Sequence, residues 1–253
     1  MLDINNNNFE NSRYARFVPL PMIGTKGMNL IRKSKATVVG CGGLGSITTT
    51  QLTALGIGYL RIIDSDIVEL TNLQRQLLYR ETDIGKPKVE IAKNFLKKLN
   101  PDVIIDAINL EINEQTVSIA SNDVDFIIDA TDKFATRYCL NKEALKQNIP
   151  FIFGAVGGVS GNTMTIQNDF ACLECLFSNI DDSQLPSSSI TGIHPSIINI
   201  IGSIQIAEVT KIMTKKVPSL LNKLLFCDIG SMQFDVLNVK PRENCLCSKY
   251  KKK

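Results

Sequence analysis

Short apolar runs alternate with segments of helical periodicity through the first part of the chain. The apolar, β-branched runs predict strands at 35–39, 59–64, 103–110, 125–129 and 150–156. Between them, apolar residues recur at helical spacing in 46–55, 89–99 and 134–146. Strands that alternate with helices in this way are typical of an α/β fold, in which a mostly parallel sheet carries helices on both faces.

This alternation stops after residue 161. Glycines at 157–161 predict a flexible joint, and three further strands are expected without intervening short helices, at 163–167, 224–228 and 233–239. Such strands predict an antiparallel C-terminal portion that continues the sheet. The long apolar segment 193–213 is interrupted by polar residues, so it predicts a buried or interface helix and no membrane span.

The composition is ordinary for a globular protein. Of the 253 residues, 44% are hydrophobic and 21% are charged, and a net charge of +3 is too small to indicate a nucleic-acid partner. Residues 1–11 contain four consecutive asparagines and predict a disordered tail, followed by a single domain over 12–253. This start lacks the basic and apolar regions of a signal peptide, so we expect a cytoplasmic protein without a membrane partner.

A glycine-rich loop follows the first predicted strand directly. Its residues are Gly40, Cys41, Gly42, Gly43, Leu44 and Gly45. Between a strand and a helix, the backbone N–H groups of such a loop can surround a phosphate at the positive end of the helix dipole. Asp64 follows at the end of the second strand, close to the spacing of about 20 residues expected of a ribose-binding carboxylate. The loop therefore predicts a Rossmann-like nucleotide site, and a tight packing turn is the alternative for the loop alone.

Polar side chains cluster in the next segment. A helical turn within 66–76 would bring Asn72, Arg75 and Gln76 onto one face. Lys88 falls in the first turn of the helix that follows, where the helix dipole disfavours a cation. A lysine at this position is better explained if it faces an anion, and a solvated lysine is the alternative.

Two aspartates follow the fourth predicted strand. Asp129 and Asp132 lie at the carboxyl end of that strand, where ligands bind in open α/β sheets and a metal would meet phosphate oxygens. Asp132 could instead cap the next helix. Near the N-terminus, Arg13 and Arg16 would share one face of a helical turn, and on their own they are better explained as solvated side chains.

Four of the seven cysteines form two pairs about 70 positions apart. Cys172 and Cys175 have the spacing of a metal knuckle, whereas Cys245 and Cys247 are one residue closer together. Four thiolates would hold a structural zinc ion with no open coordination position. A redox pair or buried unpaired thiols are the alternatives.

Together these motifs resemble the ThiF/MoeB/HesA family, the bacterial and archaeal relatives of ubiquitin-activating enzymes. The resemblance runs from about Arg13 to Cys247 and rests on the glycine loop, both acidic segments, both cysteine pairs and the segments Asn72-Leu-Gln-Arg75-Gln76 and Gly85-Lys-Pro-Lys88. It implies one adenylation domain with a nucleotide-binding half at about 35–157. The C-terminal half, about 158–247, would carry the zinc site and a crossover loop.

The resemblance also implies an activity. Members of the family use ATP and Mg²⁺ to adenylate the C-terminal glycine carboxylate of a small ubiquitin-like or sulfur-carrier protein, and pyrophosphate leaves. The implied partner ends in Gly-Gly, and the implied assembly is a homodimer. The resemblance does not indicate whether the carrier serves molybdopterin synthesis, thiamin synthesis, tRNA thiolation or protein tagging.

The residue roles implied by the resemblance centre on the phosphates. The Gly42–Gly45 backbone would hold phosphate groups, and Asp64 would bind the ribose. The α- and β-phosphates would be surrounded by Asn72, Arg75 and Lys88, with Asp66 and Gln76 in the same site. Asp132 would hold Mg²⁺. Arg16 would reach the γ-phosphate of the other subunit in trans.

Three departures from the family pattern stand out. Lys133 replaces the usual asparagine after the metal-site aspartate, and the second cysteine pair is Cys-x-Cys. The crossover stretch 184–192 contains serines, at Ser187–Ser189, and no cysteine. We therefore expect an enzyme that stops at the acyl-adenylate and forms no thioester or persulfide itself.

Two other functions are compatible with parts of the sequence. A NAD(P)-dependent oxidoreductase would use the same glycine loop and Asp64, and Tyr138 with Lys142 has the Tyr-x-x-x-Lys spacing of short-chain dehydrogenases. A dinucleotide does not, however, require Arg75, Lys88 and Asp132 together. The second alternative is a non-catalytic nucleotide-binding scaffold that recruits a carrier protein.

Overall fold

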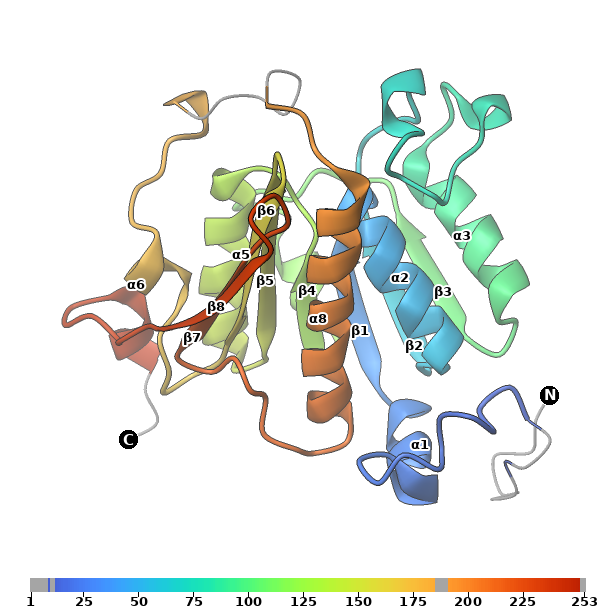
Figure 1. Ribbon diagram of the computed structural model, residues 1–253, viewed down its shortest axis with the longest axis horizontal. Coiled ribbons are helices and arrows are strands. Elements are labelled where there is room, and N and C mark those ends of the chain that lie inside the picture. Colours follow the sequence, from blue (N-terminus) through green and yellow to red (C-terminus); the bar gives the residue numbers. More distant parts are fainter. Residues whose placement is uncertain (1–8, 10–11, 185–190, 251–253) are drawn as a thin grey trace.

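One eight-stranded sheet organises the computed structural model, which describes residue 9, residues 12–184 and residues 191–250. The strand order is β3-β2-β1-β4-β5-β6-β7-β8 (Figure 1). The strands are β1 (Lys35–Val39), β2 (Tyr59–Ile63), β3 (Ile104–Ile108), β4 (Phe126–Asp129), β5 (Phe151–Gly157), β6 (Ser160–Ile166), β7 (Lys223–Asp228) and β8 (Gln233–Asn238). Every strand predicted from the hydrophobic pattern is present, within a few residues of its expected bounds.

The first five strands are parallel and the last three are antiparallel. The helices of the described residues are α1 (Gly24–Ile31), α2 (Gly43–Leu55), α3 (Lys88–Leu99), α4 (Ser118–Ser121), α5 (Phe134–Gln147), α6 (Leu173–Leu176) and α8 (Pro195–Met213). Short 3₁₀ turns lie at Leu70–Asn72, Glu81–Asp83, Asp182–Gln184 and Leu246–Tyr250. The predicted fold class, a mostly parallel Rossmann-like sheet with an antiparallel continuation, is confirmed.

The two faces of the sheet bury different sets of side chains. Ile128 and Ile152 belong to the core shared with α1, α2, α3 and the C-terminal part of α8, whereas the adjacent residues Ile127 and Phe151 belong to the core under α5. This alternation follows from the period of two along a strand. Helices α2 and α8 pack on each other on one face, and α5 packs on β4 and β5 on the other (Figure 1).

Helix α8 is long and apolar enough to cross a membrane by length and composition alone, but more than half of it is buried within the protein. Its Gln205 side chain donates hydrogen bonds to the backbone oxygens of Asp129 and Ile152. The expected buried helix is therefore confirmed.

One expectation about loops is wrong. Residues 157–161 are not a flexible joint, because Gly157 pairs with Ser160 and the segment closes the hairpin between β5 and β6. The left-handed backbone of Gly158, with φ of 58°, supplies the tight turn. The predicted tail, 1–11, lies outside the described residues except for Phe9, whose ring is buried edge-on against Tyr14.

Candidate active site

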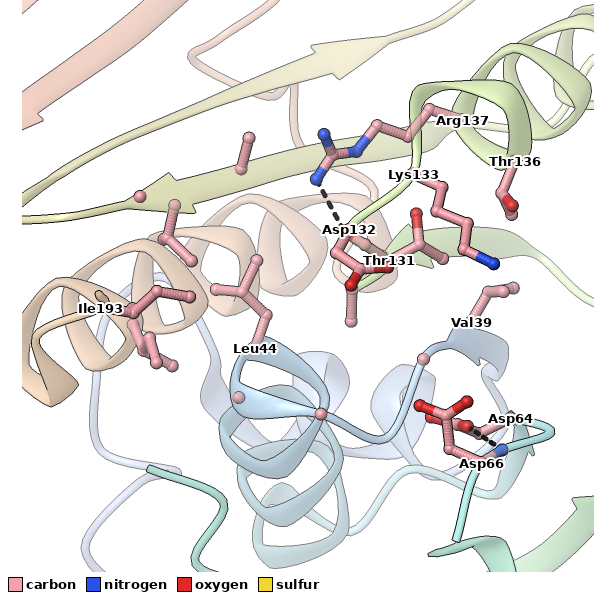
Figure 2. A pocket seen from close by; sticks show the side chains of 18 of the residues that line it. Val39, Leu44, Asp64, Asp66, Thr131, Asp132, Lys133, Thr136, Arg137 and Ile193 are labelled. Atoms are coloured by element: carbon pink, nitrogen blue, oxygen red, sulfur yellow. Dashed lines mark hydrogen bonds between the residues drawn. The ribbon is translucent and has the colours of Figure 1, made fainter. Parts of the chain in front are cut away.

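A cavity of about 930 Å³ opens at the carboxyl ends of the parallel strands. Its size is at the upper end of the roughly 300–1,000 Å³ typical of small-molecule sites. Figure 2 shows Asp64 and Asp66 on one side of the cavity, Ile193 on the opposite side and Asp132 between them. The lining runs from β2 across to the β5–β6 hairpin, so one cavity joins the predicted nucleotide site to the C-terminal half.

The glycine loop combines close packing with an open surface. A Cβ atom on Gly40, whose φ is 96°, would collide with the backbone oxygen of Ala130, and one on Gly45 would collide with the oxygen of Gly40. Close packing, the alternative to phosphate binding, therefore explains why glycine occupies these two positions. Gly42 differs, because its Cβ would meet only the Gln76 amide nitrogen, at 3.6 Å, and Gly42 lines the cavity. Helix α2 begins at Gly43, so its first N–H groups are available to an anion there.

Asp64 braces this loop. One carboxylate oxygen accepts the Cys41 backbone N–H at 2.6 Å, and the other accepts the Asp66 N–H at 2.8 Å. Burial raises the pKa of the Asp64 carboxyl, although the Cys41 N–H bond and the Lys88 charge act in the opposite direction. The carboxylate is thus fixed at the rim of the cavity, where its remaining lone pairs can accept hydroxyl groups.

Lys88 reaches the cavity from the start of α3. Its ammonium lies 2.8 Å from an Asp66 carboxylate oxygen, and its side chain is only 6% exposed. Arg75 and Gln76 line the same part of the cavity, and the Gln76 amide oxygen is buried without a partner among the described residues. These three side chains therefore lie together as predicted.

Asn72 is oriented differently from the expectation. Its amide oxygen accepts the Glu69 backbone N–H at 3.1 Å, which closes the 3₁₀ turn Leu70–Asn72. Asn72 is not among the described residues that line the cavity. The backbone N–H groups of Arg75 and Gln76 bond the Asn72 oxygen at 3.1 and 3.0 Å, so the expected turn is present, but the Asn72 side chain bonds back to Glu69.

The two aspartates after β4 have different environments. Asp129 is fully buried, and its carboxylate accepts hydrogen bonds from Arg137 Nε at 3.0 Å and from Thr131 at 2.7 Å. Arg137 also donates to the Thr131 backbone oxygen at 2.6 Å (Figure 2). Asp132 is exposed to the cavity, and no hydrogen bond or ion pair joins its carboxylate to another described residue. Asp129 therefore holds the loop, and Asp132 is the carboxylate free to meet a cation.

Helix α5 receives its N-terminal cap from a distant segment. The two Asp182 carboxylate oxygens accept the backbone N–H groups of Phe134 and Ala135, at 2.7 and 3.0 Å. The alternative role considered for Asp132, capping this helix, is therefore filled by Asp182. Lys133, which differs from the family pattern, forms a 3.5 Å ion pair with Glu111 at the mouth of the cavity, and both side chains are largely exposed.

The four paired cysteines meet on the far side of α5. The sulfurs of Cys172 and Cys245 are 3.6 Å apart, Cys175 lies 3.5 Å from both Cys245 and Cys247, and all four sulfurs fall within 4.8 Å of one another. Tetrahedral zinc with Zn–S bonds of about 2.3 Å requires S···S distances of about 3.8 Å. Burial and the neighbouring Cys175 raise the pKa of Cys247 to about 12, so four thiolates need a cation to coexist.

Several residues considered from the sequence lie elsewhere. Arg16 is exposed, lies in a series of turns and is not among the described lining residues. Tyr138 is not among them either, and its hydroxyl bonds the backbone of Phe177 and Ile180. Tyr138, one of the two residues whose spacing resembles that of short-chain dehydrogenases, therefore has a structural role. Ser187–Ser189 of the crossover stretch lie outside the described residues.

Sequence reasoning missed Arg137, Asp182 and Asn162, all of which line the cavity. Arg137 carried a usable signal, because it is a cation near the start of a helix, as Lys88 is. No sequence signal pointed to Asp182 or Asn162, since their roles depend on contacts made by the folded chain.

Comparison with protein-family models gives a match to the ThiF family over residues 14–249. The chain belongs to the ThiF family. This ThiF-family chain is 33% identical over 234 residues to the SAMP-activating enzyme E1 of Haloferax volcanii, covering 92% of this chain and 87% of the relative. It is 31% identical over 243 residues to the sulfur carrier protein adenylyltransferase of Thermus thermophilus, and the match covers 93% of this chain and 90% of the relative.

Other relatives are longer. The chain spans 55% of the adenylyltransferase and sulfurtransferase MOCS3 of Aedes aegypti, at 34% identity over 243 residues and 94% coverage of this chain. Among solved structures, it superposes on Escherichia coli MccB with ATP at a TM-score of 0.84 and 26% identity, covering 96% of this chain and 75% of that one. Two of the three sequence relatives are named as adenylyltransferases, one of them of a sulfur carrier protein, and the third is named as an activating enzyme.

Proposed function

We propose that this ThiF-family protein adenylates the C-terminal glycine carboxylate of a small ubiquitin-like or sulfur-carrier protein at the expense of ATP. The observation that carries the proposal is the single cavity, which joins the glycine loop, Lys88 and Asp132 to a wall built by the β5–β6 hairpin. A nucleotide needs only the first part of this cavity. The remainder gives room for a second substrate.

In the reaction, a carboxylate oxygen of the carrier attacks the α-phosphorus, and the bond from that phosphorus to the bridging oxygen of pyrophosphate breaks. The α2 N-terminus and Lys88 offset the negative charge that the phosphates carry. Asp64 accepts the ribose hydroxyls, with Arg75 and Gln76 beside the phosphates. Asn72 acts indirectly, since it closes the turn that carries Arg75.

Two metals are part of the proposal. Asp132 would hold Mg²⁺, since it offers an unpaired carboxylate beside the phosphate site, and the ion would neutralise charge on the leaving pyrophosphate. Cys172, Cys175, Cys245 and Cys247 would hold a structural zinc ion, because their sulfur spacing fits a tetrahedral site.

The proposed assembly is a homodimer in which Arg16 of one subunit serves the site of the other. Arg16 is exposed on an N-terminal segment that does not line its own cavity, as a residue acting in trans requires. The crossover stretch without cysteine supports an enzyme that releases the acyl-adenylate and leaves sulfur transfer or thioester formation to another protein.

Exchange of labelled pyrophosphate into ATP tests the proposal. Purified protein is incubated with Mg²⁺ and candidate ubiquitin-like carriers that end in Gly-Gly, and the matched control is each carrier without its last glycine. Exchange is expected only with an intact carrier. Tight ATP binding with no exchange for any carrier would favour the scaffold alternative, and reduction or oxidation of a bound nicotinamide cofactor would favour the oxidoreductase.

A further inference from the structure

The hydroxyl group of Tyr79 reaches the glycine loop from the interior of the protein. Tyr79 is buried in the core, and its hydroxyl donates a hydrogen bond to the backbone oxygen of Cys41 at 2.7 Å. Burial raises the pKa of Tyr79, so the hydroxyl keeps its proton and remains a donor. The oxygen of Cys41 is therefore held from the core side of the loop.

The same peptide group carries the N–H of Gly42. A trans peptide is planar, and its C=O and N–H groups point in opposite directions. Because the Cys41 oxygen points toward Tyr79 in the core, the Gly42 N–H points away from the core. Gly42 is half-buried and lines the cavity, and its own oxygen is occupied by the N–H and hydroxyl groups of Ser46. Its N–H bonds none of the described residues, so it is a donor available to a ligand.

The local backbone does not enforce this orientation by itself. A Cβ atom built on Gly42 would meet only the Gln76 side chain, at 3.6 Å, so the Cys41–Gly42 peptide group could turn over with little steric opposition. Its oxygen would then face the cavity and repel phosphate oxygens. Asp64 fixes only the preceding peptide group, through the Cys41 N–H. Among the described residues, Tyr79 is the one whose side chain bonds the Cys41–Gly42 peptide group.

Tyr79 also belongs to the segment that carries two other side chains of the proposed phosphate site. It follows Arg75 by four residues, and its backbone N–H bonds the Gln76 oxygen at 3.3 Å. Arg75 and Gln76 both line the cavity. The hydrogen bond from Tyr79 to Cys41 therefore joins this segment to the glycine loop, so the two phosphate-binding elements keep a fixed relative position.

We propose that Tyr79 is a positioning residue for ATP, which holds the Cys41–Gly42 peptide group with its N–H directed at the phosphates. This inference rests on the proposed function and deepens it, because it names the side chain that sets the shape of the phosphate site. Tyr79 is not among the described residues that line the cavity, so it acts through Gly42. Loss of its hydroxyl should weaken the contacts to phosphate and leave the contacts to the nucleoside.

The first test removes only this hydroxyl group, in the variant Tyr79→Phe. Calorimetric titration with ATP and Mg²⁺ should give a Kd about tenfold above that of the wild type, which corresponds to about 1.4 kcal/mol. The Kd for adenosine, which lacks phosphates and is measured by NMR titration, should stay within about twofold. A role of Tyr79 in folding alone would change both affinities or neither.

Tyr138→Phe is the matched control. The Tyr138 hydroxyl also donates to a backbone oxygen, that of Phe177 at 3.1 Å, and Tyr138 is not among the described lining residues. Its loss should leave the Kd values for ATP and adenosine within about twofold of the wild type, because no phosphate contact depends on it. Thermal unfolding followed by circular dichroism checks that both variants are folded at the assay temperature.

A second measurement observes the peptide group directly. The Cys41–Gly42 bond is the only Cys-Gly bond in the sequence, so protein labelled with ¹³C-carbonyl cysteine and ¹⁵N glycine gives one NMR signal for it. In the wild type, ATP should move the Gly42 amide proton signal and adenosine should not. In Tyr79→Phe this movement should shrink. If the variant folds poorly, the wild-type titration still tests the contact between ATP and the Gly42 N–H.

Three results would overturn the inference: an unchanged Kd for ATP in Tyr79→Phe, equal losses of affinity for ATP and adenosine, or a wild-type Gly42 signal that bound ATP does not move. If the wild type binds ATP but supports exchange with no carrier, the proposed function fails while these measurements still decide the role of Tyr79. The two failures are therefore distinguishable. A wild-type protein that binds no ATP would remove both.

Discussion

At the scale of single residues, Lys88 carries the largest expected effect. Its side chain is 6% exposed, whereas that of its partner Asp66 is 65% exposed. A buried ammonium whose ion-pair partner is solvated is well placed to meet phosphate. Lys88→Met should lower pyrophosphate exchange by about 100-fold, the scale seen when a transition-state hydrogen-bond donor is removed.

Lys86→Met is the matched control for this variant. Lys86 lies two residues earlier with a side chain that is 52% exposed, and it bonds Thr82 and Asp83 outside the cavity lining. Exchange should remain within about twofold of the wild type, because a surface ion pair contributes little. Equal losses in both variants, or full activity in Lys88→Met, would contradict the assignment of Lys88.

Asp64 predicts a pH dependence of ATP binding. Because burial raises the pKa of its carboxyl, protonation begins at a higher pH than for an ordinary aspartate near 3.9. Affinity for ATP, measured by calorimetry, should fall as the pH drops through this raised pKa. The sign for folding is the opposite: a native pKa above the unfolded value means that protonation of this group stabilises the fold.

Asp64→Asn separates these effects. The variant should bind ATP more weakly at neutral pH and should lose the acid-side decline. A decline of the same size in Asp64→Asn would assign it to another group. Circular dichroism over the same pH range checks that the loss of affinity is not unfolding.

Residue-level prediction from sequence succeeded where a local pattern constrained the side chain. The helix dipole singled out Lys88, and the same reasoning applied to α5 would have found Arg137. It missed the orientation of the Asn72 side chain, because sequence spacing does not show that its amide oxygen bonds back to the Glu69 N–H. Asn162 was out of reach, since its position at the cavity depends on the neighbouring strands.

At the scale of elements, the start of α5 depends on Asp182. This residue binds the first two N–H groups of the helix, immediately after the loop that carries Asp132 and Lys133. Asp182→Ala should lower the free energy of unfolding by about 1 kcal/mol, the usual loss for a capping side chain. Because the cap positions Asp132, the Mg²⁺ concentration needed for half-maximal exchange should also rise.

Asp181→Ala is the neighbouring control. Its carboxylate bonds Ser183, whose backbone N–H it accepts at 2.9 Å, and among the described residues it forms no hydrogen bond with α5. The control should leave the Mg²⁺ requirement unchanged. A variant of Asp182 that lost stability with an unaltered Mg²⁺ requirement would limit its role to capping.

The cysteine cluster predicts a metal-dependent stability. Purified protein should contain one zinc ion per chain by mass spectrometry, and Cys245→Ser should lose it. At about 2–4 °C per kcal/mol for a chain of this size, loss of several kcal/mol would lower Tm by on the order of 10 °C. Cys139→Ser, at a half-buried thiol outside the cluster, is the control. A zinc-free protein with an unchanged Tm would contradict the site.

Elements were predictable where the pattern was periodic. The strands followed from apolar runs, and β1 to β5 alternate between two cores as the pattern requires. The turn at 157–161 was misread because glycines permit both a joint and a hairpin, and the choice is made by backbone pairing between Gly157 and Ser160. The sequence pattern does not show which backbone groups of this segment pair with each other.

At the scale of the whole molecule, the trans role of Arg16 can be tested by mixing subunits. Arg16→Ala and Lys88→Met should each be inactive in exchange. If the protein is a dimer that acts in trans, random mixing makes half of the dimers mixed, each with one intact site, so about a quarter of wild-type activity should return. No recovery after verified subunit exchange would contradict the trans role.

The cysteine cluster also has a consequence for the order of events during synthesis. Cys175 and Cys245 are 70 positions apart. At about 5–20 residues per second, the first pair is made roughly 4 to 14 s before the second pair. During that interval the nucleotide-binding half is already complete in sequence, while Cys172 and Cys175 are open thiols. If the cluster binds the proposed zinc ion, the complete site can capture it only after Cys245 and Cys247 have been made, so the first pair of thiols waits for the second.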